Sequence, residues 1–111
     1  MEQRDLLISA VRDKIKPWHL KFREAKKKMT KILLVEDDDQ IASYLGELLR
    51  AECFDTQISG SKKEAGECLL AQAFDLVLLD VSLPDGNGFS ICAEIKKEYE
   101  IPVIFLTASG D

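Results

Sequence analysis

The sequence has few of the features that mark a membrane or secreted protein. Its 111 residues contain no apolar run long enough to span a bilayer, and the N-terminus lacks the uninterrupted apolar core of a secretory signal. The three cysteines (Cys53, Cys68 and Cys92) are odd in number and form no Cys-x-x-Cys pair, so we expect reduced thiols packed in helices. These absences favour a cytoplasmic protein, and the length limits it to one domain.

Charge is unevenly distributed along the chain, although the net charge is only −5. Residues 1–29 contain nine Lys or Arg and four Asp or Glu, a net charge of +5. Residues 30–111 contain six Lys or Arg and sixteen Asp or Glu, a net charge of −10. This asymmetry predicts two parts, a basic extension over 1–29 and an acidic domain over 30–111. The acidic charge argues against direct nucleic-acid binding by the domain.

The basic extension is predicted to be helical over residues 3–28, with a kink at Pro17. Its apolar residues recur at spacings of three and four, which places them on one helical face: Leu7, Val11, Ile15, Trp18 and Phe22. We call this face the apolar stripe. Three interpretations remain open: a solvated extension without function, a docking or membrane-surface helix, or a stretch wrongly joined upstream of a protein that begins at Met29.

Short apolar runs alternate with amphipathic segments throughout the acidic domain. The expected strands cover 32–35, 54–58, 74–79 and 102–106, and the expected helices cover 41–51, 61–72 and about 89–95. Helix caps are expected at Asp38 or Asp39, at Ser61 paired with Glu64, and at Asn87. This alternation predicts an α/β fold with a doubly wound parallel sheet, flavodoxin-like, in which the strand order is 2-1-3-4.

Polar side chains follow the expected strands at their carboxyl ends. Glu36 and Asp37 end the first strand, Asp80 ends the third and Thr107 ends the fourth. In a sheet of this order the first and third strands are neighbours at the switch point, where doubly wound folds bind ligands. Three clustered carboxylates would repel one another, and a divalent cation such as Mg²⁺ relieves that repulsion. A nucleotide is not expected, because the sequence lacks a Gly-rich phosphate loop.

Three motifs carry a family resemblance that covers residues 30–111. They are Ile-Leu-Leu-Val-Glu-Asp-Asp at 32–38, Asp-Leu-Val-Leu-Leu-Asp-Val-Ser-Leu-Pro-Asp-Gly-Asn-Gly at 75–88, and Pro-Val-Ile-Phe-Leu-Thr-Ala at 102–108. With these motifs in this order, the chain resembles a bacterial response regulator receiver domain of two-component signalling.

The resemblance implies a role for each polar residue at the strand ends. Asp80 would be the phosphoacceptor, taking a phosphoryl group from a phosphohistidine on a sensor histidine kinase. Glu36, Asp37, Asp80 and the backbone carbonyl of Ser82 would hold Mg²⁺, and Thr107 would contact the phosphoryl group and drive the conformational switch. The implied protein is a phosphoacceptor that modifies itself, not a turnover enzyme. Asp38 and Asp85 are expected to be only cap and turn residues.

The family pattern continues beyond the last motif, with further helices, a fifth strand and a Lys that pairs with the phosphoryl group. We therefore expect a C-terminally truncated receiver domain without an output domain. The fourth strand would have an open apolar edge, which predicts self-association through that strand or a partly molten state. The extension could lie over the sheet face that a fifth helix covers in a full receiver.

Two other functions compete with the phosphoacceptor interpretation. The first is an inactive receiver fragment that acts only as an interaction or dimerisation protein. The second is a Mg²⁺-dependent phosphohydrolase, which is disfavoured because Val81 and Ser82 follow Asp80 where an Asp-x-Asp motif would be needed.

Overall fold

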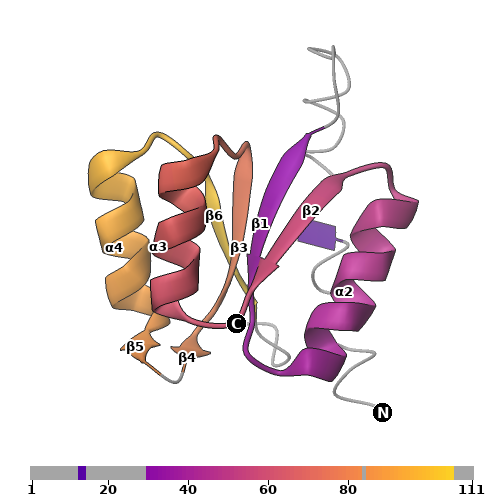
Figure 1. Cartoon of the computed structure of the whole chain (residues 1–111), viewed down its shortest axis with the longest axis horizontal. Coiled ribbons are helices and arrows are strands. Elements are labelled where there is room, and N and C mark those ends of the chain that lie inside the picture. Colours follow the sequence, from indigo (N-terminus) through magenta and orange to yellow (C-terminus); the bar gives the residue numbers. More distant parts are fainter. Residues whose placement is uncertain (1–12, 15–29, 84, 107–111) are drawn as a thin grey trace.

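Strands and helices alternate along the chain as the sequence predicts (Figure 1). The computed structural model describes residues 13–14, 30–83 and 85–106. Its main sheet has four parallel strands in the order β2-β1-β3-β6. The strands are β1 (Lys31–Val35), β2 (Asp55–Ser59), β3 (Leu76–Asp80) and β6 (Val103–Leu106), and the helices are α2 (Asp39–Ala51), α3 (Lys62–Ala71) and α4 (Gly88–Glu98). The predicted fold class and strand order are confirmed.

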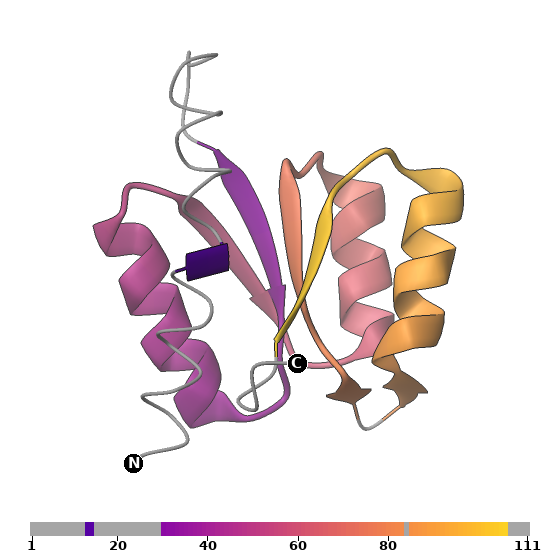
Figure 2. The same cartoon turned by 180° about the vertical axis from the view of Figure 1, so that it is seen from behind.

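Helices lie on both faces of the sheet, α2 on one face and α3 with α4 on the other (Figures 1 and 2). Successive residues of β1 point to opposite faces, so Ile32 and Leu34 join one apolar cluster whereas Leu33 and Val35 join the other. All four are fully buried, as expected for a central parallel strand. In β6, residues 103–105 are half-buried, because β6 lies at one edge of the described sheet.

Each helix begins at the cap residue that the sequence indicates. The Asp38 carboxylate accepts the amide protons of Gln40 and Ile41, which identifies Asp38 rather than Asp39 as the cap of α2. Ser61 caps α3, and its hydroxyl accepts from the Glu64 amide. The Glu64 carboxylate accepts from the amide of residue 60, one position before the usual capping-box donor. Asn87 caps α4 through bonds from residues 89 and 90.

A small antiparallel hairpin lies between β3 and α4, in a segment where the sequence analysis predicts no strand. It pairs β4 (Ser82–Leu83) with β5 (Gly86–Asn87). Asp85, expected to be a simple turn residue, reaches from this hairpin to the start of α3. Its carboxylate accepts from the amides of Lys62 and Lys63 at 2.8 and 3.2 Å, and these bonds lower the pKa of Asp85. The hairpin is therefore held against α3 by contacts between distant residues.

Cys53 corrects the expectation that all three cysteines pack within helices. Cys68 and Cys92 lie in α3 and α4, but Cys53 is exposed, follows α2 and has a left-handed backbone with φ of 71°. Its amide donates to the Arg50 carbonyl, and the Phe54 amide donates to the Leu49 carbonyl. This bonding pattern is a Schellman motif, in which glycine is the preferred residue at the left-handed position.

Cys53→Gly is expected to raise the free energy of unfolding by about 0.5–1 kcal/mol. Glycine removes the clash between Cβ and the backbone at positive φ, and this gain exceeds its larger loss of chain entropy. Urea unfolding under reducing conditions measures the change. Cys53→Ala is the matched control, because it removes the thiol, keeps Cβ and should give no such gain. A fall in stability for the glycine variant would contradict the assignment.

Two predictions fall on residues outside the described part of the chain. Of the predicted extension over 1–29, the structure describes only Asp13 and Lys14, which are helical. Thr107 lies outside the described residues. Among the described helices, none has the length and apolar composition that crossing a membrane requires.

Candidate functional site

The fold brings three carboxylates together at the carboxyl ends of β1 and β3. Glu36 and Asp37 directly follow β1, whereas Asp80 is the last residue of β3. The two strands are neighbours, and their pairing sets Val35 opposite Leu79. One carboxylate oxygen from each of Glu36, Asp37 and Asp80 lies within 4.8 Å of the others. The predicted cluster therefore forms, and we call it the acidic cluster.

Glu36 is the buried member of the acidic cluster, with only 6% of its surface exposed. Its amide donates to the Ser59 carbonyl at 3.0 Å, which fixes the backbone between β1 and β2. The pKa of Glu36 is raised from 4.5 to about 8, chiefly by burial and also by the nearby carboxylates of Asp80 and Asp37. The Asp38 amide opposes this shift by donating to the Glu36 carboxylate at 3.1 Å. A pKa of about 8 means that Glu36 carries a proton near neutral pH.

The other two members differ in their access to solvent. Asp37 is exposed and Asp80 is half-buried, so the cluster has one closed side at Glu36 and one open side. A ligand approaching from solvent would therefore meet Asp37 and Asp80 first. This difference in exposure suits a site in which the buried carboxylate holds a ligand in place and an accessible carboxylate reacts with it.

Without divalent cations, stability is expected to fall as the pH rises from about 5 to about 8. Folded Glu36 keeps its proton to about pH 8, whereas the unfolded residue loses it near 4.5. Between these values the folded state binds more protons than the unfolded state, so the free energy of unfolding decreases with rising pH. Urea unfolding in the presence of a chelator at several pH values measures this slope.

Glu36→Gln should flatten the slope, because the amide does not titrate in this range. Glu47→Gln, a change at an exposed residue of α2, is the matched control and should leave the slope as in the wild type. An unchanged slope in the Glu36 variant would show that another group causes it.

The remaining predicted site residues are only partly placed. The Ser82 backbone lies in β4, paired with Asn87, and is two residues beyond Asp80. Leu106 pairs with Asp80 at the end of β6, and Thr107 comes next in the sequence but lies outside the described residues. The roles of Ser82 and Thr107 therefore stay predictions.

Gly88 supports the end of β3, a role that the sequence analysis missed. Its amide donates to the Val81 carbonyl at 2.8 Å. A Cβ atom at position 88 would lie 2.7 Å from the Val81 Cα and closer still to the carbonyl oxygen of Asp80. Only glycine allows α4 to begin this close to the backbone of the acidic cluster. The available signal was the Gly-x-Gly spacing at 86–88.

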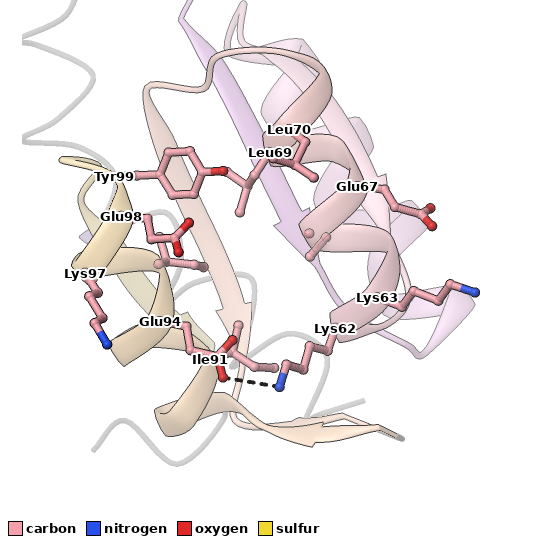
Figure 3. Close-up of a pocket in the computed structure, with 13 residues that line it drawn as sticks. Lys62, Lys63, Glu67, Leu69, Leu70, Ile91, Glu94, Lys97, Glu98 and Tyr99 are labelled. Atoms are coloured by element: carbon pink, nitrogen blue, oxygen red, sulfur yellow. Dashed lines mark hydrogen bonds and ion pairs between the residues drawn. The ribbon is translucent and has the colours of Figure 1, made fainter.

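A groove of about 520 Å³ between α3 and α4 is separate from the acidic cluster (Figure 3). Lys62 and Glu94 form an ion pair across it at 3.3 Å. Its charged lining mixes both signs, and none of the three clustered carboxylates contributes to it. The groove is therefore no part of the candidate site.

Comparison with known proteins gives consistent matches to one family. Residues 32–111 match the family described as response regulator receiver domain. The chain is 40% identical over 83 residues to the response regulator ArlR of Staphylococcus saprophyticus, covering 75% of this chain and 38% of that protein. It is 42% identical over 82 residues to the transcriptional regulatory protein CpxR of Escherichia coli K12, covering 74% of this chain and 35% of that protein.

Solved structures of similar fold agree with these matches. The non-phosphorylated HemR receiver domain from Leptospira biflexa has a TM-score of 0.63 and 40% identity, covering 68% of this chain and 62% of that one. The BeF3-activated receiver domain of Klebsiella pneumoniae RstA has a TM-score of 0.66 and 28% identity, covering 68% of this chain and 65% of that one. The chain spans little more than a third of the length of the curated relatives described above.

Proposed function

The chain belongs to the response regulator receiver domain family, and from this premise we propose that Asp80 accepts a phosphoryl group from a sensor histidine kinase. The observation that carries the proposal is the acidic cluster itself. Three carboxylates from the ends of two adjacent strands lie within 4.8 Å of one another, and Asp80 is on the solvent-accessible side.

The residues present fit a bound Mg²⁺. Two or three carboxylates with water and a phosphate are the usual ligands of this ion. Burial and the nearby carboxylates raise the pKa of Glu36, and a bound cation would offset the repulsion among the three carboxylates. Glu36, Asp37 and Asp80 would hold the ion together with the backbone carbonyl of Ser82. When bound, it would neutralise charge on the transferred phosphoryl group.

Asp80 supplies the nucleophile in the proposed reaction. One of its carboxylate oxygens forms a bond to the phosphorus of the phosphohistidine, while the bond between phosphorus and the imidazole nitrogen breaks. The electron pair stays on that nitrogen, which takes a proton from solvent. The product is an aspartyl phosphate, and Thr107 would contact its phosphoryl oxygens. The chain is thus proposed to modify itself once per transfer, without turning over a separate substrate.

The proposed partner is a sensor histidine kinase, and the proposed location is the cytoplasm, where such a phosphohistidine is presented. The described residues give no support to the alternative of an inactive fragment that acts only in dimerisation. Self-association through β6 stays a prediction.

The full chain incubated with acetyl phosphate and Mg²⁺ should carry the modification at Asp80 and at no other carboxylate. Reductive trapping followed by peptide mass spectrometry identifies the residue. A chelator should prevent the reaction, because the transferred group would then lose its counter-charge. Modification at Asp37, or at equal extent without Mg²⁺, would overturn the proposal.

A further inference from the structure

The sheet face shared with α2 is more completely buried than α2 alone explains. One helix is about 10 Å across and strands lie about 4.8 Å apart, so one helix covers about two strands. On the opposite face α3 and α4 together cover the sheet, whereas α2 packs against β1 and β2. On this side Leu76 and Leu78 of β3 and Leu106 of β6 nevertheless have at most 3% of their surface exposed, whereas Ile104 of β6 is half-buried. We call the area over these three leucines the β3–β6 face.

The described part of the N-terminal extension lies next to this face. The Lys14 ammonium donates to the Phe105 carbonyl of β6 at 3.3 Å, across 91 positions of sequence. Both views place the helical Asp13–Lys14 fragment on the α2 side of the sheet (Figures 1 and 2). Lys14 is half-buried whereas Asp13 is exposed, so one side of this short helix is turned toward the protein.

On a helix continued from Asp13–Lys14 in both directions, the sequence spacing would put the apolar stripe on the side of Lys14. Lys14 is three residues after Val11, a spacing that makes the two neighbours on a helix. Asp13 is two residues from both Val11 and Ile15, which places it on the opposite side. The extension also carries +5 against the −10 of the rest of the chain. The orientation of Lys14, the apolar pattern of the extension and its positive charge thus all favour the extension as the occupant of the β3–β6 face.

We propose that the apolar stripe of the extension packs in cis on the β3–β6 face and completes the core beside α2. Lys14 would anchor the stripe to the outer strand through the Phe105 carbonyl. The extension would then be an integral element of the domain rather than a detached arm.

Amide hydrogen exchange on the full chain tests this, with Val11→Gln combined with Ile15→Gln. In this stripe variant, amides of β3 and β6 should exchange at least about tenfold faster than in the wild type, with β2 unchanged. Ser9→Gln combined with Asp13→Gln has the same spacing on the other helical side and should exchange as the wild type does. Wild-type protection in the stripe variant would overturn the proposal.

A second variant locates the contact even if the stripe variant unfolds. Lys14→Met removes the donor but keeps an apolar stem, and should speed exchange in β6 alone. Lys16→Met, the matched lysine on the other side, should have no effect. Equal exchange in the two lysine variants would overturn the placement.

Sedimentation at several concentrations separates the occupants: a wild-type dimer that the stripe variant dissociates would assign the face to a second copy, against the proposal.

Discussion

Asp80→Asn is expected to reduce phosphorylation by acetyl phosphate to below about one hundredth of the wild-type rate. The amide oxygen carries no full negative charge, so it is a poor nucleophile toward phosphorus. The substitution also removes one of the three carboxylates that would hold Mg²⁺. Both effects act on the same step, which is why the expected loss is large. Gel electrophoresis that separates the phosphorylated from the unmodified chain measures the rate.

The Asp80 variant should remain folded, which separates loss of chemistry from loss of structure. Asn is nearly the same size as Asp, and removing a charge that raises the pKa of Glu36 relieves repulsion in the acidic cluster. Asp39→Asn is the matched control, since Asp39 is exposed in the first turn of α2 and outside the cluster. The control should react at the wild-type rate. An Asp80 variant that is labelled as fast as the control would exclude Asp80 as the acceptor.

Gly88→Ala is expected to lower the free energy of unfolding by about 3 kcal/mol. The added Cβ would meet the backbone at Asp80 and Val81, and backbone atoms cannot rotate away as the end of a flexible side chain can. Either α4 must shift or the end of β3 must move, and both changes break the bond from the Gly88 amide to the Val81 carbonyl. Urea or thermal unfolding measures the loss.

The same substitution should also slow phosphorylation under conditions where the variant is folded, because a displaced β3 end moves Asp80 away from Glu36 and Asp37. Gly66→Ala is the matched control. Gly66 is exposed in α3, and a Cβ there would meet nothing within 4 Å. Alanine is more favourable than glycine in a helix interior, so the free energy of unfolding of the control should rise by about 0.5–1 kcal/mol. A Gly88 variant as stable as this control would show that α4 can move without cost.

The order of strands and helices was predictable because it depends on local patterns. Apolar runs of the length of a buried strand end at Glu36 and Asp80, and helical spacing follows each of them. The caps at Asp38, Ser61 and Asn87 were also predictable, since a cap bonds to amides two or three residues further along the chain. The position of the acidic cluster followed from these elements, because the carboxyl ends of neighbouring parallel strands meet at one edge.

Features that depend on distant contacts were not predictable from the sequence. Asp85 was interpreted as a turn residue, but it bonds to the start of α3, more than twenty positions earlier. Cys53 was expected inside a helix, but the Schellman motif that turns the chain toward the buried Phe54 forces it into the left-handed region. The hairpin of β4 and β5 was not predicted, because each strand has two residues, too few to show the alternation of apolar and polar residues that marks a strand.

Which carboxylates meet could be predicted, because strand ends are defined by local patterns of apolar and polar residues. How those carboxylates differ depends on the folded protein around them. Glu36 is buried and its pKa is raised to about 8, whereas Asp37 is exposed to solvent. The two are adjacent in the sequence and both acidic, so no local pattern distinguishes them. Burial separates them, because desolvation of a charge depends on what the rest of the fold places around it.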